Sequence, residues 1–320
     1  TIGPYNYGGK LRHPFTAHPK IDPLTGEMMF FGYSPLAPLL QYNVVSPSGE
    51  LSNTTGVRLQ KPVMMHDFAV TEHYSIFMDL PVTFDLRRQA RGEPMLAYEP
   101  GRGSRFGVLP RHGRAKEIRW FDSPGCFIFH TLNAYEEGDD IVLMACRLSE
   151  FPDSIKFPPP KNSSDDPFDV PTALYRWRFN MQSGETREEA LDDLAVDFPR
   201  INDKLLGRAT RFGYALDLQM GGLVKYDFTK ATSASHPHGL GRKGGEPVFV
   251  SRPDPKAEDD GWLVSFVYDE AEEKSELVIV DAQDFTSTPV ARVKIPARVP
   301  FGFHGTWLTA DQLASQRGSV

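Results

Sequence analysis

The sequence predicts an all-β protein in which four-stranded antiparallel sheets repeat radially, as in a β-propeller. Its 320 residues include 22 Phe, 11 Tyr and 4 Trp, which supply a large apolar core. They also include 27 Gly and 27 Pro, which are typical of a chain with many turns. β-rich runs recur at intervals of about 50 residues, the size of one propeller blade. A β-sandwich is the weaker alternative.

The expected strands come in pairs and quartets. The clearest quartet lies near the C-terminus, at 246–251, 261–269, 275–282 and 288–296. Earlier pairs are 63–72 with 74–86, 105–111 with 118–123, and 126–133 with 140–147. At this spacing the chain yields roughly five to six blades. Few helices are expected: the charged segment 186–194 predicts a short surface helix, and residues 157–167, rich in Pro and Ser, predict a long loop.

Charge and cysteine content exclude several classes of protein. There are 42 acidic residues against 35 Lys and Arg, a net charge of −7, whereas nucleic-acid binders usually carry a basic excess. We therefore expect no nucleic-acid partner. Only Cys126 and Cys146 are present, both in apolar runs, which favours a reducing compartment and a cytoplasmic location. No apolar run reaches the ~18 residues of a membrane-spanning helix.

Four of the nine histidines share one local setting, beside apolar or β-branched residues at or near a strand: His18, His66, His130 and His304. Successive separations are 48, 64 and 174 residues, near one, one and three blade lengths. A propeller gathers equivalent positions of its blades at the central channel. Neutral nitrogen ligands suit Fe, Zn, Cu or Ni rather than Mg or Ca. Taken singly, each histidine is better explained as a hydrogen-bonded, half-buried strand residue, so only the joint spacing indicates a metal.

The other histidines are weaker candidates. His236 and His238 lie in a loop rich in Ser, Pro and Gly, which predicts a mobile surface turn. His73 and His112 have polar neighbours and are expected to be solvated, and His13, beside a proline, is expected to be structural.

Five motifs in the chain resemble those of the carotenoid cleavage dioxygenase family, also called the carotenoid oxygenases. They are T-A-H-P-K at 16–20, H-D-F at 66–68, F-H-T-L-N-A-Y-E-E at 129–137, G-G-E-P at 244–247 and P-F-G-F-H-G at 300–305. The resemblance runs in the family's order over nearly the whole chain. It implies a seven-bladed β-propeller whose axial Fe(II) is held by His18, His66, His130 and His304, with long loops capping the metal face. It also implies cleavage of a conjugated C=C bond by O₂ into two carbonyl products.

The start of the chain bears on how much of that fold is present. The sequence begins at Thr1 without an initiator Met, and a Gly-rich, strand-like stretch follows at once. We therefore expect a single propeller domain over residues 1–320 that lacks the family's N-terminal segment and covers the last five to six blades.

The resemblance also implies glutamates behind three of the four ligands, each orienting a histidine ring. Glu246 in the G-G-E-P motif matches one of them and is expected to orient His304. Where the family carries Glu-Phe-Pro-Arg-Ile, this chain has Asp197, whose shorter side chain would reach His130 only through a backbone shift or a water molecule. The third glutamate would precede Thr1.

The implied chemistry requires no catalytic residue beyond the metal ligands, because the electron-rich alkene itself supplies electrons to O₂. An apolar tunnel would position the substrate, and Phe129, Phe198 and Phe303, each beside a ligand or its expected partner, are the candidates to line it. Plain core packing explains these three side chains equally well. A polyene drawn from a bilayer would also need an apolar patch, so peripheral membrane contact is compatible with this function.

Three functions follow from these observations. The first is Fe(II)-dependent cleavage of a carotenoid or apocarotenoid into two aldehydes. The second is cleavage of a phenolic stilbene, as in the lignostilbene dioxygenases of the same family. The third is a non-catalytic propeller scaffold or fragment, which Asp197 and the expected missing segment would explain.

Overall fold

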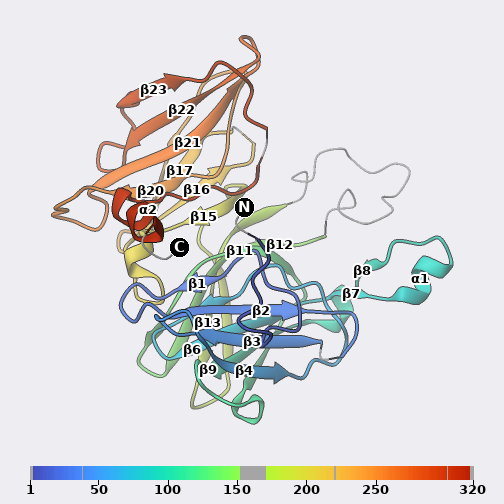
Figure 1. Ribbon diagram of the computed structural model, residues 1–320. Coiled ribbons are helices and arrows are strands. Elements are labelled where there is room, and N and C mark those ends of the chain that lie inside the picture. The colour runs from blue at the N-terminus through green and yellow to red at the C-terminus, as the bar shows by residue number, and fades with distance from the viewer. Residues whose placement is uncertain (1–2, 38, 152–170, 220, 301, 318–320) are drawn as a thin grey trace. The chain divides into compact units, whose positions relative to one another are not determined.

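The computed structural model describes residues 3–37, 39–151, 171–219, 221–300 and 302–317. Within these ranges the regular secondary structure is almost entirely β-strand, in five antiparallel sheets of four or five strands and one small hairpin (Figure 1). Five such sheets in succession are the blades of a propeller, which confirms the predicted fold class and the lower bound of five to six blades. The loop expected at 157–167 lies outside the described residues.

Each sheet is built from strands that are close in sequence. The first sheet contains β1 (Lys20–Ile21), β2 (Met28–Tyr33), β3 (Leu40–Val45) and β4 (Leu51–Val57). The second contains β5 (Ala69–Val70), β6 (Tyr74–Asp79), β9 (Ser104–Pro110) and β10 (Arg119–Ser123), and between β6 and β9 the chain forms the hairpin β7 (Val82–Phe84) and β8 (Leu96–Tyr98). The third contains β11 (Phe127–Glu137), β12 (Asp140–Leu148), β13 (Thr172–Asn180) and β14 (Thr186–Ala190).

Two further sheets and a few short helices complete the described chain. The fourth sheet contains β15 (Val196–Arg200), β16 (Phe212–Asp217), β17 (Leu223–Asp227) and β18 (Thr232–His236). The fifth contains β19 (Arg242–Gly244), β20 (Val248–Ser251), β21 (Gly261–Asp269), β22 (Lys274–Asp281) and β23 (Ala291–Lys294). The helices are α1 (Leu86–Ala90), α2 (Ala310–Arg317) and the 3₁₀ turns η1 (Pro100–Arg102), η2 (Ala115–Glu117) and η4 (Asp203–Leu205). Among them, none is long and apolar enough to cross a bilayer.

The helix expected at 186–194 is wrong: its first five residues form β14, the outer strand of the third sheet. Glu188 points inward, where it accepts hydrogen bonds from Trp177 Nε1 at 2.9 Å and Ser123 Oγ at 2.7 Å. Arg187 and Glu189, on either side of Glu188, are exposed. Exposed charges protect an edge strand from pairing with other chains. Partners far along the chain thus override the local pattern.

The strand expected at 246–251 is also different in detail. Two short strands, β19 and β20, pair with successive parts of β21, and the chain is interrupted between them. Glu246 lies in this interruption. An irregular edge strand of this kind redirects a side chain that a regular ladder would hold on the sheet face.

By its internal contacts the chain divides into two compact units. The first comprises Thr1–Ala195 with Asp203–Ala209, and the second comprises Val196–Asn202 with Thr210–Val320. The first therefore holds the first three sheets and the second holds the last two. That residues 1–320 form one domain stays a prediction.

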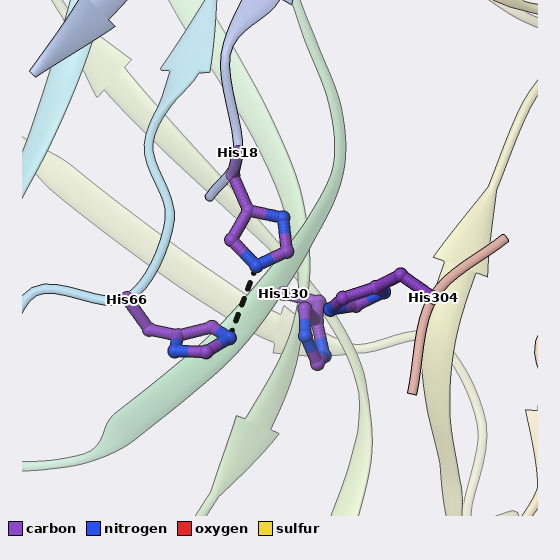
Figure 2. Close-up of side chains that lie close together, drawn as sticks. All are labelled: His18, His66, His130 and His304. Carbon is purple, nitrogen blue, oxygen red and sulfur yellow. Dashed lines mark hydrogen bonds between the residues drawn. The ribbon is translucent and has the colours of Figure 1, made fainter. Parts of the chain in front are cut away.

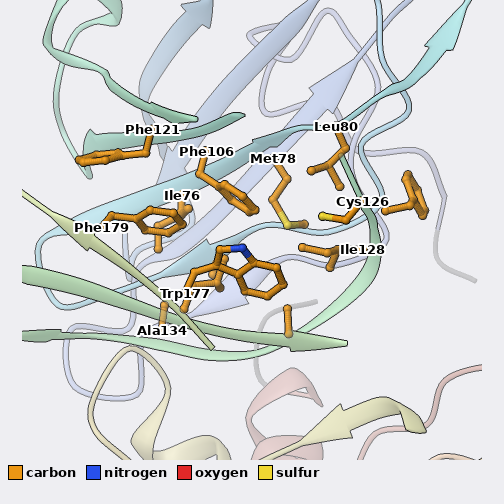
Figure 3. Packing of buried hydrophobic residues seen from close by; sticks show 14 of the residues in the cluster. Ile76, Met78, Leu80, Phe106, Phe121, Cys126, Ile128, Ala134, Trp177 and Phe179 are labelled. Atoms are coloured by element: carbon orange, nitrogen blue, oxygen red, sulfur yellow. The ribbon is translucent and has the colours of Figure 1, made fainter. Parts of the chain in front are cut away.

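The core of the first unit forms where its sheets pack face to face. Strand β12 is buried at nearly every position, on both faces, as expected for a blade covered from both sides. Phe106, Trp177 and Phe179 meet at ring-centroid distances of 5.0–5.5 Å, with Met78 and Cys126 beside them (Figure 3). A separate cluster in the second unit includes Tyr214 and Leu263.

Candidate metal centre

Three of the predicted ligands converge within the first unit (Figure 2). The Nε2 atoms of His18 and His66 lie 3.0 Å apart and share a hydrogen bond. The His130 ring centroid lies 5.3 Å from that of His18 and 5.1 Å from that of His66. One ring nitrogen from each histidine lies within 4.8 Å of the other two.

The three histidines occupy related positions in three successive sheets. His18 precedes β1, His66 precedes β5, and His130 lies within β11, and each of these strands is the edge strand of its sheet. The register between β11 and β12 shifts between Ile128 and Thr131, so an irregularity in the ladder accompanies His130. Such an irregularity turns a side chain out of the regular alternation. The spacing argument from the sequence therefore corresponds to a real equivalence of position for these three residues.

The cluster is chemically suited to a transition metal. Burial lowers the pKa of His18 to about 3; Asp67 opposes that effect, and Lys20, His66 and His130 lower the pKa further. At neutral pH this imidazole is therefore uncharged, the form that binds metals. With metal–nitrogen bonds of about 2.0–2.1 Å, two ligands at a right angle would lie about 3 Å apart, as the His18 and His66 nitrogens do. The histidine cluster could therefore hold a metal such as Fe, Zn, Cu or Ni.

His304, the fourth side chain drawn in Figure 2, belongs to the second unit and is described there by its own contacts. Its Nδ1 donates to Glu246 Oε1 at 3.3 Å, and the adjacent Gly305 N–H donates to Glu246 Oε2 at 2.8 Å. Arg200 Nη1 lies 3.5 Å from the same carboxylate, which is 6% exposed. Glu246 thus contacts the histidine that the motif assigned to it.

Asp197 lies in β15 opposite Leu216, and the register of the strand shifts immediately after it, between Asp197 and Arg200. Its side chain is 2% exposed, and its Oδ1 accepts a hydrogen bond from the Phe198 N–H at 2.7 Å. That this carboxylate orients His130 stays a prediction.

The three phenylalanines expected to line a tunnel have different surroundings. The Phe129 ring lies 5.3 Å from His66 in an edge-to-face arrangement and 4.8 Å from Phe127. Phe198 is buried against His304 at 5.6 Å, whereas Phe303 is exposed. Both Phe198 and Phe303 have positive φ, 53° and 62°, a strained conformation for a bulky residue that marks local constraint. Their role toward a substrate stays a prediction.

Asp67 belongs to the H-D-F motif, and the sequence alone indicates no role for it. It is 1% exposed and its Oδ1 lies 2.8 Å from Lys20 Nζ. Although burial favours the neutral acid, Lys20 and His18, with hydrogen bonds from Lys20 and Thr131, hold the pKa of Asp67 well below its usual range. The available signal was its position immediately after His66.

The mobile surface turn expected around His236 is wrong. His236 ends β18, is 5% exposed, and donates from Nδ1 to the Phe285 carbonyl at 2.8 Å. Burial lowers the pKa of His238 to about 4, with His236, Arg242 and Arg292 adding to the effect. By contrast, His73 and His112 are solvated as expected, beside Glu136 and Glu27.

Comparisons with known proteins agree with this site. The family model described as "Retinal pigment epithelial membrane protein" matches residues 1–309. The chain is 42% identical to carotenoid 9,10(9',10')-cleavage dioxygenase 1 of Pisum sativum, over 99% of the chain and 62% of that protein. It is 33% identical to the carotenoid cleavage oxygenase of Mycobacterium tuberculosis, over 96% of the chain and 70% of that protein. The chain thus spans less than two thirds of the plant relative.

Solved structures give the same result. Lignostilbene dioxygenase of Pseudomonas brassicacearum superposes with a TM-score of 0.88 at 32% identity, over 97% of this chain and 69% of that one. Cobalt-substituted Synechocystis apocarotenoid oxygenase superposes with a TM-score of 0.86 at 28% identity, over 97% and 68%. The chain has a histidine cluster and successive antiparallel sheets, and it matches the family model over residues 1–309. It therefore belongs to the carotenoid oxygenase family, the family to which the retinal pigment epithelial membrane protein model refers.

Proposed function

We propose that the protein is a non-haem Fe(II) dioxygenase that cleaves a conjugated C=C bond of a carotenoid or apocarotenoid with O₂, giving two aldehydes. The observation that carries this proposal is the convergence of His18, His66 and His130 from three successive sheets. The names of the relatives that match nearly the whole chain support the substrate class.

In this proposal His304 supplies the fourth ligand through Nε2. Its Nδ1 already donates to Glu246, and a carboxylate on one ring nitrogen selects the tautomer whose other nitrogen carries the lone pair. The bound Fe(II) would supply the redox chemistry that adds O₂ to the alkene. Uncharged imidazoles would hold the metal without neutralising its charge, and His18 is uncharged at neutral pH.

The remaining tasks of the protein are to position the alkene and to exclude water. Phe129 is suited to both, because its ring lies edge-to-face against His66 and continues into the apolar side chains of Phe127 and Phe151. We propose that Phe198, which packs against His304, and Phe303 also contact the substrate. A long apolar polyene partitions into bilayers. We therefore propose that the protein is cytoplasmic and contacts a membrane peripherally to reach its substrate.

A stilbene substrate is the second candidate, favoured by the likeness to lignostilbene dioxygenase. The two substrates differ in a way that an assay separates, because a stilbene is short and carries a phenol whereas a carotenoid is a long hydrocarbon. Turnover of a 4-hydroxystilbene without turnover of any long polyene would replace the leading proposal by this one.

Anaerobic loading with Fe(II), followed by reaction under ¹⁸O₂, tests the function. We expect one iron per chain and one ¹⁸O atom in each aldehyde. A protein that stays iron-free after loading would refute the enzyme proposal and favour a non-catalytic scaffold. Incorporation of ¹⁸O into only one product, with water supplying the other, would refute dioxygenase chemistry while leaving iron binding intact.

A further inference from the structure

We propose that Asp67 is a positioning residue that joins the three histidine-bearing segments of the first unit and sets the spacing of their ligand nitrogens. The proposal rests on the metal centre proposed above and adds the device that holds it in place. Asp67 acts through two partners, Lys20 and Thr131. The three residues are called the Asp67 clamp below.

The clamp touches each segment close to its histidine. Asp67 directly follows His66, Thr131 directly follows His130, and Lys20 is two residues after His18. Asp67 Oδ1 lies 2.8 Å from Lys20 Nζ. Asp67 Oδ2 accepts hydrogen bonds from the Thr131 N–H at 2.8 Å and from Thr131 Oγ1 at 2.7 Å. One carboxylate therefore connects the chain positions beside all three ligands.

Regular secondary structure does not by itself fix these positions. His18 and His66 lie in irregular segments before β1 and β5, strands of only two residues each. Around His130 the register between β11 and β12 shifts, between Ile128 and Thr131 and again between Thr131 and Asn133. β11 is the edge strand of its sheet, and the Thr131 N–H donates to Asp67 Oδ2. On this open edge of the sheet, where no further strand of the described chain is paired with β11, the Asp67 side chain accepts the backbone hydrogen bond.

The energetics also favour a positioning role. The Asp67 side chain is 2% exposed and the Lys20 side chain 15%, so this is a mostly buried ion pair. Such pairs often add little net stability, because desolvation offsets their attraction, but they do select one arrangement of the groups they join. The pair is also neutral as a whole, so it orients the site without adding net charge to it.

A buried aspartate elsewhere in the same unit provides a matched control. Asp79 is 0% exposed and is paired with Arg102 at 2.7 Å and Arg105 at 2.5 Å. It has the same chemistry and a similar burial, but it is not adjacent in sequence to any of the three histidines. A purely structural role for Asp67 predicts that Asp67→Asn and Asp79→Asn behave alike.

The experiment measures Co(II) binding to the metal-free protein through the visible absorption bands of the ion, which report both affinity and coordination geometry. Thermal unfolding of the metal-free protein is measured in parallel. We expect Asp67→Asn to weaken Co(II) binding by about 10–100-fold and to change its spectrum. Asp79→Asn should lower the unfolding temperature but keep the wild-type affinity and spectrum.

Wild-type affinity and spectrum in Asp67→Asn would overturn the proposal. If Asp67→Asn does not fold, Thr131→Val and Thr131→Ser decide the matter, because only the serine keeps the hydroxyl that donates to Asp67. The valine variant should bind Co(II) several-fold more weakly than the serine variant, and equal affinities would overturn the clamp. Failure of the wild-type protein to bind Co(II) would instead refute the metal centre itself.

Discussion

Asp22→Asn should strongly lower the free energy of unfolding of the first unit, because it removes a buried carboxylate that several groups contact. Asp22 is 0% exposed and accepts a hydrogen bond from Arg111 Nη1 at 2.6 Å. Arg208 approaches the same carboxylate at 3.4 Å, and the Leu24 N–H donates to it at 2.8 Å. The aspartate therefore joins the turn after β1, the residue after β9 and the segment before β16.

The expected cost follows from what the amide leaves behind. Arg111 is only 4% exposed, so without the carboxylate its guanidinium becomes a buried cation without its counter-charge. Breaking a buried ion pair costs about 3–5 kcal/mol, and the low end applies because the asparagine oxygen still accepts one hydrogen bond. A loss of about 3 kcal/mol lowers the unfolding temperature of a unit of this size by roughly 6–12 °C.

The same interaction predicts a pH dependence. Burial by itself raises the pKa of Asp22, but the hydrogen bond from Arg111 and those from the Leu24 and Thr25 N–H groups outweigh it and lower the pKa to about 2. The unfolded value is about 3.9, so the unfolded chain binds the proton first as pH falls. The contribution of Asp22 is therefore fully present above about pH 4 and is lost as the pH falls toward 2.

Urea denaturation of wild type and Asp22→Asn at pH 7 and near pH 2.5 measures both effects. The difference in unfolding free energy should be large at pH 7 and clearly smaller near pH 2.5, where the unfolded aspartate is already protonated and the native one is only beginning to be. Glu93→Gln is the control, because its ion pair with Arg91 is exposed and such pairs contribute little. A difference that is the same at both pH values, or below about 1 kcal/mol at pH 7, would refute the reasoning.

Three further outcomes test the metal centre and the core. His130→Ala should abolish iron binding and turnover, whereas His238→Ala, outside the cluster, should leave iron stoichiometry unchanged; equal effects in an iron assay would contradict the ligand assignment. Asp197→Glu should raise iron occupancy, because the longer side chain could orient His130 directly. Unchanged iron occupancy would mean that the local backbone already compensates for the shorter aspartate. Cys126 is 0% exposed and burial raises the pKa of its thiol to about 11, so a thiol reagent should label it only after unfolding. Rapid labelling of the native protein at Cys126, followed by mass spectrometry, would show that this part of the core opens.

Local pattern was sufficient for the regular part of the fold. The run 261–269 coincides with β21, and the pair 126–133 with 140–147 anticipates β11 and β12. In these strands apolar residues either alternate with polar ones or form a short continuous run. Both patterns are typical of buried or half-buried strands, and the structure buries these residues accordingly. The prediction for 186–194 was wrong because a run of charged residues is compatible with both an exposed helix and an edge strand. The contact of Glu188 with Trp177 decides between them.

The histidine cluster was also within reach of the sequence, because a metal site would restrict both residue type and blade position. The identities of His18, His66 and His130, and the pairing of Glu246 with His304, follow from motifs that contain the residues themselves. What surrounds them does not follow in this way. Asp67 carries no periodic signal, and its partner Thr131 lies 64 residues away.

The sequence by itself thus determined the all-β class, the blade spacing and the types of residue that could bind a metal, since short-range sequence pattern indicates each of them. Only the tertiary structure decided which polar groups meet behind the histidine cluster, and it also decided that His236 is buried against Phe285, 49 residues away. The physical reason is that a buried carboxylate or imidazole takes its state from the groups packed around it. Folding brings those groups together from separate strands, and no local pattern records them.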